Sequence, residues 1–191
     1  MTERVGILGG TFDPPHIGHL ALAVQARVQL RLDRVLLVVA NDPWQKRDGR
    51  RISPAGVRLA MVEAAVEGRP GLEASDIEIV RGGESYTTDT ASELTQSDRE
   101  LYLIIGADLV GQLRSWERCD ELVPLVTLAV ARRGGTPETD VAAPWRWVAL
   151  RLPRLELSST ELRAMAAQGL PLEFLVPDGA ISVMLAHDLY R

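Results

Sequence analysis

The sequence has little of what stabilises secreted proteins or places proteins in membranes. Its 191 residues include one cysteine, Cys119, so no internal disulfide can form, and we expect a reducing, cytoplasmic environment. No apolar run approaches the roughly 18 residues of a transmembrane helix, and no signal-peptide pattern precedes the first apolar run. We therefore expect no membrane partner.

The sequence also lacks an excess of basic residues. The formal net charge is -5 at pH 7, so the overall field does not attract nucleic acid, and we expect no nucleic-acid partner. Any phosphate site must then be a local cluster. Two common phosphate-binding patterns, G-x-G-x-x-G and Walker A, are both absent after the first predicted strand.

What remains is an ordinary globular composition, 46% hydrophobic and 25% charged. Near-continuous apolar runs alternate with helical patterns, which is typical of strands buried on both faces of a parallel sheet. The runs are residues 5–8, 35–40, 101–106, 125–131 and 147–152. We predict an α/β fold, a Rossmann-like doubly wound parallel sheet with helices on both faces. It forms one domain over residues 1–191, with a small C-terminal helical segment at about 158–191.

Residues 9–19, GGTFDPPHIGH, form a glycine-rich turn between the first predicted strand and a predicted helix. Backbone N–H groups can approach a phosphate at such a turn, and the helix N-terminus adds partial positive charge. His16 and His19 are three residues apart, so both can face one ligand and donate hydrogen bonds to its phosphate oxygens. The apolar face predicted for this helix consists of Ile17, Leu20, Ala21, Val24 and Val28.

Two further polar stretches precede predicted helices. The loop after the second strand holds Lys46, whose charge can meet a phosphate; a solvated basic loop is the alternative. Residues 82–90 lead into a helix predicted at 90–96, a suitable place for an anion. Tyr86 can cover an aromatic ring there, and Thr88 or Asp89 can cap the helix.

Three later stretches stand at strand ends or helix starts. Asp108 follows Gly106 and suits either a nucleotide ribose or the cap of its own helix. Arg132 and Arg133 close the next strand, where phosphate binding competes with simple solvation. Residues 158–163, SSTELR, begin a helix with hydroxyls and N–H groups at its start, which suits a triphosphate but is also an ordinary capping pattern.

Together these stretches resemble the HxGH nucleotidyltransferases, and among them the bacterial nicotinate-nucleotide adenylyltransferases. The resemblance rests on residues 9–19, the Lys46 loop, SYTTDT at 85–90, GAD at 106–108 followed by Trp116, and SSTELR at 158–163. Two positions depart from the family pattern: Gln45 stands where a histidine is common, and Glu117 where an aromatic residue is common.

The resemblance implies a role for each residue. The catalytic residues would be His16, His19, Lys46 and Arg163. ATP would be bound by the two histidines, Arg163 and the following residues: Gly9, Gly10, Thr11, Phe12, Gly106, Asp108, Arg132, Arg133, Ser159 and Thr160. The mononucleotide would be bound by Thr11, Lys46, Tyr86, Thr87, Asp108 and Trp116.

The implied reaction transfers AMP from ATP to nicotinate mononucleotide, giving nicotinate adenine dinucleotide and pyrophosphate in NAD biosynthesis. The resemblance implies Mg²⁺ as the companion of ATP, and a homo-oligomer is an open alternative to a monomer. His16 and His19 also have a spacing found in zinc sites. Because His187 is the one other histidine, we expect no metal held by protein ligands alone. Phosphopantetheine, nicotinamide mononucleotide and a non-catalytic ATP sensor remain alternatives at this stage.

Overall fold

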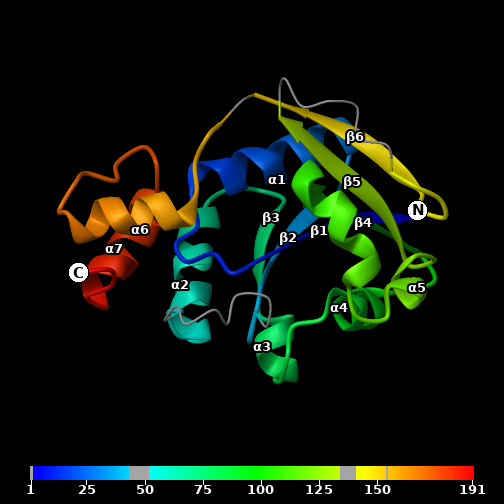
Figure 1. The fold of residues 1–191 in the computed structure, drawn as a ribbon, viewed down its shortest axis with the longest axis horizontal. Helices are drawn as coiled ribbons and strands as arrows, with labels where there is room; N and C mark the ends of the chain where they lie inside the picture. The colour runs from blue at the N-terminus through cyan, green and yellow to red at the C-terminus, as the bar shows by residue number, and fades with distance from the viewer. Residues whose placement is uncertain (1, 44–51, 134–140, 154) are drawn as a thin grey trace.

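The computed structural model describes residues 2–43, 52–133, 141–153 and 155–191. Its centre is a parallel sheet with the strand order β3-β2-β1-β4-β5-β6 (Figure 1). The strands are β1 (Glu3–Gly10), β2 (Arg34–Val39), β3 (Leu72–Ser75), β4 (Arg99–Gly106), β5 (Val126–Arg133) and β6 (Trp147–Leu152). The predicted Rossmann-like α/β fold is confirmed, and all five predicted strands are present.

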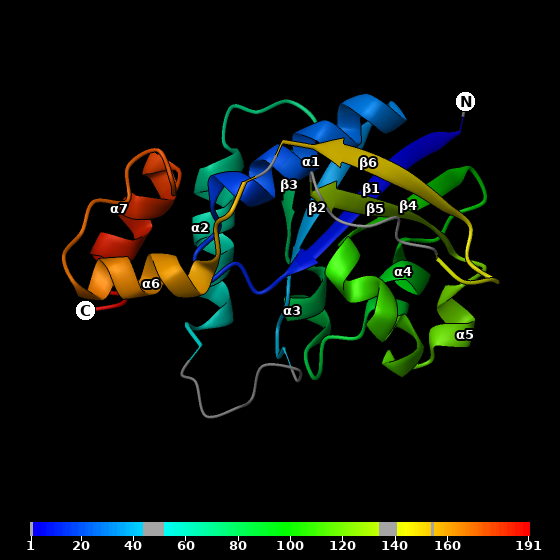
Figure 2. The same ribbon diagram turned by 45° about the horizontal axis from the view of Figure 1, so that its top comes forward.

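Helices cover both faces of the sheet (Figures 1 and 2). They are α1 (Ile17–Leu30), α2 (Ala55–Val66), α3 (Ile77–Arg81), α4 (Thr87–Leu94), the 3-10 helix η2 (Ala107–Ser115), α5 (Cys119–Leu122), α6 (Ser159–Ala167) and α7 (Asp178–Ala186). One hydrophobic core lies between the sheet and α1 and α2. A second core lies on the opposite face, beneath α4, η2 and α5.

The predicted buried face of α1 is right for Leu20 and wrong for Val24 and Val28. The helix buries Leu20, Ala23, Ala26 and Leu30, whereas Val24 is 42% exposed and Val28 is 64% exposed. Apolar residues surround most of this helix, so its pattern does not select one face. The two buried alanines let the helix lie close to the sheet.

The C-terminal helices α6 and α7 lie beside α2, at the end of the molecule opposite the N-terminus (Figures 1 and 2). They share a third core with Met61 and Ala65 of α2, to which they and the segment between them contribute Leu162, Leu172, Val176, Ala180 and Met184. Gly179 allows the close approach of α7 to α2, because a Cβ there would lie 2.8 Å from the carbonyl oxygen of Ala64. This packing places the start of α6 next to the end of β1.

Among the helices of the described residues, none has the length and apolar character needed to cross a bilayer.

Candidate active site

A cleft of about 610 Å³ opens at the carboxyl ends of β1 and β4. These are the neighbouring strands at which the strand order reverses, so the cleft lies at the switch point where ligands of such sheets bind. Most of the predicted site residues line it: Gly9, Gly10, Thr11, Phe12, His16, His19, Tyr86, Thr87, Gly106, Asp108, Trp116, Ser159 and Thr160. The fold thus brings together motifs that are far apart in the sequence.

The two histidines stack on each other at the start of α1. Their ring centroids are 3.7 Å apart at an interplanar angle of 22°. His16 is the N-cap residue, and its backbone N–H donates to Nδ1 of His19 over 3.2 Å. Since Nδ1 of His19 accepts this bond, a neutral His19 ring carries its proton on Nε2. Phe12 supports His19 edge-on, with ring centroids 5.0 Å apart.

Two glycines of residues 9–19, which we call the histidine loop, pack closely against ring side chains. A Cβ on Gly10 would lie 2.9 Å from the buried Phe12 ring. A Cβ on Gly18 would lie 3.0 Å from Nδ1 of His16. The glycine inside the HxGH sequence therefore makes room for the first histidine ring.

The start of α6 borders the same cleft. Ser158 caps the helix, because its side-chain oxygen accepts the N–H of Glu161 over 3.2 Å, as predicted. The Ser159 hydroxyl donates to the Pro14 carbonyl over 2.9 Å, which ties α6 to the histidine loop. N–H groups at such a helix start favour an anion.

Arg163 lies behind this helix start and is absent from the residues that line the cleft. Its guanidinium donates to the carbonyl oxygen of Asp13 over 2.7 Å and to the Thr160 hydroxyl over 3.0 Å. Arg163 therefore joins α6 to the histidine loop from outside the cavity.

The cleft is also lined by Tyr86, Thr87, Asp108 and Trp116. Tyr86 is the N-cap residue of α4 and donates its hydroxyl to Glu84. The predicted capping by Thr88 or Asp89 is wrong, since no side chain caps α4 and both residues lie inside it. Capping by Asp108 is likewise not seen, because Gly106 is the N-cap of η2 and no side chain caps that helix.

A buried hydrogen-bond network that the sequence did not predict lies beneath the histidine loop. Arg58 of α2 is 1% exposed and donates to the carbonyl oxygens of Thr11 (2.9 Å), Ser53 (2.8 Å) and Asn41 (3.2 Å). Burial lowers the pKa of its guanidinium, and the nearby Asp13 carboxylate opposes this. Tyr190 donates its hydroxyl to the Asp13 carboxylate over 2.5 Å. The sequence signal that could have indicated this burial is the isolated position of Arg58 among the apolar residues of α2.

Three predicted residues cannot be compared with the structure. Lys46 lies outside the described residues. Arg132 and Arg133 end β5, and their side chains lie outside the description.

A second cleft of about 660 Å³ lies beyond Trp116, between η2, α5 and residues 141–145. It contains neither histidine and no part of α6. We place the active site in the first cleft, because the donors suited to phosphate meet there.

Within the described part of the chain, no group of three or more His, Cys, Asp or Glu residues could hold a metal ion.

A switch-point cleft lined by paired imidazoles and by a hydroxyl-bearing helix start is typical of a nucleotide-binding α/β enzyme. The comparisons with known proteins agree: residues 7–165 match the family described as cytidylyltransferase-like. The probable nicotinate-nucleotide adenylyltransferase of a Roseiflexus species is 43% identical over 98% of both chains. That of Corynebacterium kroppenstedtii is 38% identical, over 98% of this chain and 90% of its own length.

The fold matches the solved structure of Plasmodium falciparum nicotinic acid mononucleotide adenylyltransferase complexed with NaAD. The TM-score is 0.80 at 18% identity, over 98% of this chain and 97% of the other. This chain belongs to the cytidylyltransferase-like family and, within it, to the nicotinate-nucleotide adenylyltransferases.

Proposed function

We propose that this chain transfers the AMP group of ATP to nicotinate mononucleotide in the cleft described above, with nicotinate adenine dinucleotide and pyrophosphate as products. The observation that carries the proposal is one cleft lined by the stacked His16 and His19, the start of α6, and the aromatic side chains of Tyr86 and Trp116. Family membership and high identity to the adenylyltransferases support it.

The reaction is a direct displacement at phosphorus. An oxygen of the mononucleotide phosphate bonds to the α-phosphorus of ATP, and the bond from that phosphorus to the bridging oxygen breaks as pyrophosphate leaves. A phosphate monoester is already ionised at neutral pH, so no general base is required. Positioning and charge stabilisation supply most of the acceleration.

His16 and His19 are the donors closest to the reacting centre in this proposal. With its proton on Nε2, a neutral His19 is a hydrogen-bond donor, and a protonated ring donates more strongly. Ser159, Thr160 and the N–H groups at the start of α6 hold the departing phosphates. Gly9, Gly10, Thr11 and Phe12 line the junction between ATP and its acceptor.

The remaining roles follow the resemblance. Gly106, Asp108, Arg132 and Arg133 belong to the nucleotide side, and Lys46 belongs to the phosphates. Tyr86, Thr87 and Trp116 surround the pyridine ring. Arg163 acts on the phosphates through Thr160 and the loop that it holds.

Mg²⁺ enters with ATP, and when bound it supplies neutralisation of the phosphate charge. The C-terminal helices belong to the same catalytic domain, since α6 contributes Ser159 and Thr160 to the cleft. The lone Cys119 supports a reducing compartment. A homo-oligomer remains a proposal that sedimentation can test.

The test is pyrophosphate release from ATP with three acceptors in parallel: nicotinate mononucleotide, nicotinamide mononucleotide and phosphopantetheine. We expect the highest kcat/KM with nicotinate mononucleotide and a product with the mass of nicotinate adenine dinucleotide. A preference for phosphopantetheine would refute the assignment, because that acceptor has no ring for Tyr86 and Trp116. ATP binding without pyrophosphate release would indicate a sensor instead of an enzyme.

A further inference from the structure

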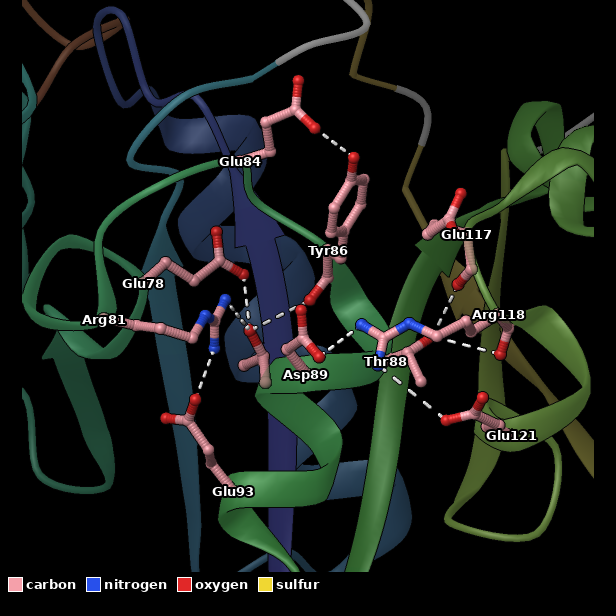
Figure 3. Close-up of polar contacts among 11 residues, drawn as sticks. Glu78, Arg81, Glu84, Tyr86, Thr88, Asp89, Glu93, Glu117, Arg118 and Glu121 are labelled. Atoms are coloured by element: carbon pink, nitrogen blue, oxygen red, sulfur yellow. Dashed lines mark hydrogen bonds and ion pairs between the residues drawn. The ribbon is translucent and has the colours of Figure 1, made fainter.

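The start of α4 is fastened to the segment that carries Trp116 by side chains of residues that the proposed reaction does not use (Figure 3). Thr88 is 3% exposed, and its hydroxyl donates to the Glu117 carbonyl oxygen over 2.8 Å. Asp89, the next residue, forms an ion pair with Arg118. The two contacts therefore hold Glu117 and Arg118, which are successive residues of the same segment.

Glu117 and Arg118 directly follow Trp116 in the chain. Arg118 has a left-handed backbone with φ 50°, and the N–H of Cys119 donates to the Trp116 carbonyl oxygen over 3.2 Å. Trp116 therefore sits in a tight turn whose position relative to α4 is set by Thr88 and Asp89. Tyr86 is the N-cap residue of that same helix. Both aromatic side chains line the cleft.

We propose that Thr88 and the Asp89–Arg118 ion pair are positioning residues that set the gap between Tyr86 and Trp116. They thereby control the affinity for the pyridine ring of the mononucleotide. This inference rests on the proposed function, because it takes the ring to lie between these two side chains.

The gap matters because contact with an aromatic ring is sensitive to distance. A separation that grows by about 0.5–1 Å forfeits about a quarter to a half of each contact's attraction. Stacking also requires a narrow range of ring separations. The phosphate-binding donors on α1 and α6 are anchored elsewhere, so loosening Thr88 or Asp89 should leave ATP binding unchanged.

The global fold should tolerate loss of the ion pair. Its partners are part-exposed, at 39% for the Arg118 side chain and 29% for the Asp89 side chain, and exposed pairs contribute little to stability. Arg118 also lies 3.9 Å from Glu121, so it keeps a carboxylate nearby in an Asp89→Asn variant. A binding defect in that variant then reports position and not unfolding.

The chain offers a matched control on the same helix. Glu93, one turn after Asp89, pairs with Arg81 over 2.9 Å and does not line the cleft. Glu93→Gln and Asp89→Asn make the same chemical change, from a carboxylate to an amide, at one side-chain ion pair each. Of these two carboxylates, Asp89 pairs with the segment that follows Trp116, and Glu93 pairs with Arg81 of α3 (Figure 3).

The experiment measures KM for each substrate and kcat in wild type, Thr88→Val, Asp89→Asn and Glu93→Gln. We expect KM for nicotinate mononucleotide to rise about tenfold in Thr88→Val and about threefold in Asp89→Asn. KM for ATP and kcat should stay within about twofold, and Glu93→Gln should match wild type. Quenching of tryptophan fluorescence by the mononucleotide alone, with Trp116→Phe as reference, reports ring binding independently of turnover.

The outcomes separate the two proposals. If wild type fails to use nicotinate mononucleotide, the proposed function fails. If wild type uses it and both Thr88→Val and Asp89→Asn keep its KM and quenching, the positioning role is refuted. Equal rises in KM for ATP and mononucleotide would also refute it, because they would indicate general loosening of the cleft.

Discussion

The contact between Tyr190 and Asp13 gives a stability prediction that can be worked out from the structure. The Tyr190 hydroxyl donates to the carboxylate of Asp13, a residue that is 1% exposed. A hydrogen bond to a charged group contributes about 1.5–3 kcal/mol when buried. Because the tyrosine itself is only half-buried, we expect Tyr190→Phe to lower the free energy of unfolding by about 1–2 kcal/mol at pH 7.

The pH dependence of this contribution has a definite sign. Burial, and then the bond to Asp13, raises the pKa of Tyr190 above its ordinary value of 10.0. A group whose pKa is raised on folding contributes stability that is complete below the unfolded pKa and is lost as pH rises toward the folded pKa. Wild type should therefore lose stability more steeply than Tyr190→Phe above about pH 10, by at most about 1.4 kcal/mol per pH unit.

Urea denaturation of both proteins at several pH values between about 8 and 11 tests this prediction. The difference between them should be constant at the lower pH values and shrink at the higher ones. The other tyrosines are present in both proteins, so their titration cancels. Adding Asp13→Asn completes a double-mutant cycle that isolates the Tyr190–Asp13 coupling. Curves that stay parallel up to pH 11, or a coupling near zero, would refute the reasoning.

Three further predictions concern the histidine loop. Replacing His16 or His19 by alanine should lower kcat by about 10²–10³ and change KM for nicotinate mononucleotide little. Steady-state kinetics test this. A rise in KM as large as the fall in kcat would contradict the role of these donors. Arg58→Met leaves three carbonyl oxygens without their donor and should destabilise the protein by about 3–5 kcal/mol in thermal unfolding; an unchanged melting temperature would show that those bonds are dispensable. Gly18→Ala places a Cβ 3.0 Å from Nδ1 of His16 and should reduce kcat about tenfold or more with a small loss of stability; normal turnover would mean that the His16 ring position is not critical.

The sequence predicted most strands of the sheet correctly because the central strands have a clear apolar pattern. The strands β1, β2, β4 and β5 are buried on both faces, so their apolar runs are nearly continuous. The strand β3 was missed because only Leu72 of its four residues is buried. The face of α1 was mistaken because the large valines point outward and the small alanines inward. In both cases tertiary packing decides what the local pattern leaves open.

The cleft residues were predicted from the family resemblance, and for the strand ends and helix starts also from chain topology. Strand ends and helix starts converge at the switch point, so Gly10, Gly106 and Ser159 meet there despite their separation in sequence. The position of Arg58 within its helix gives no such indication. Arg58 stands alone among apolar residues of its helix, and the carbonyl oxygens that hold it buried cannot be located from the sequence.

The histidine loop is held in place by residues from distant parts of the chain. Its polar backbone is satisfied by Arg58, 47 residues from Thr11, and by Arg163, 150 residues from Asp13. Tyr190, 177 residues from Asp13, fixes the loop's carboxylate. A loop held by such distant groups forms only when α2, α6 and the C-terminal residues have docked. The packing of the C-terminal residues and the shape of the histidine loop are therefore thermodynamically coupled, because local opening of α6 or of the segment around Tyr190 releases bonds to Asp13, three residues before His16.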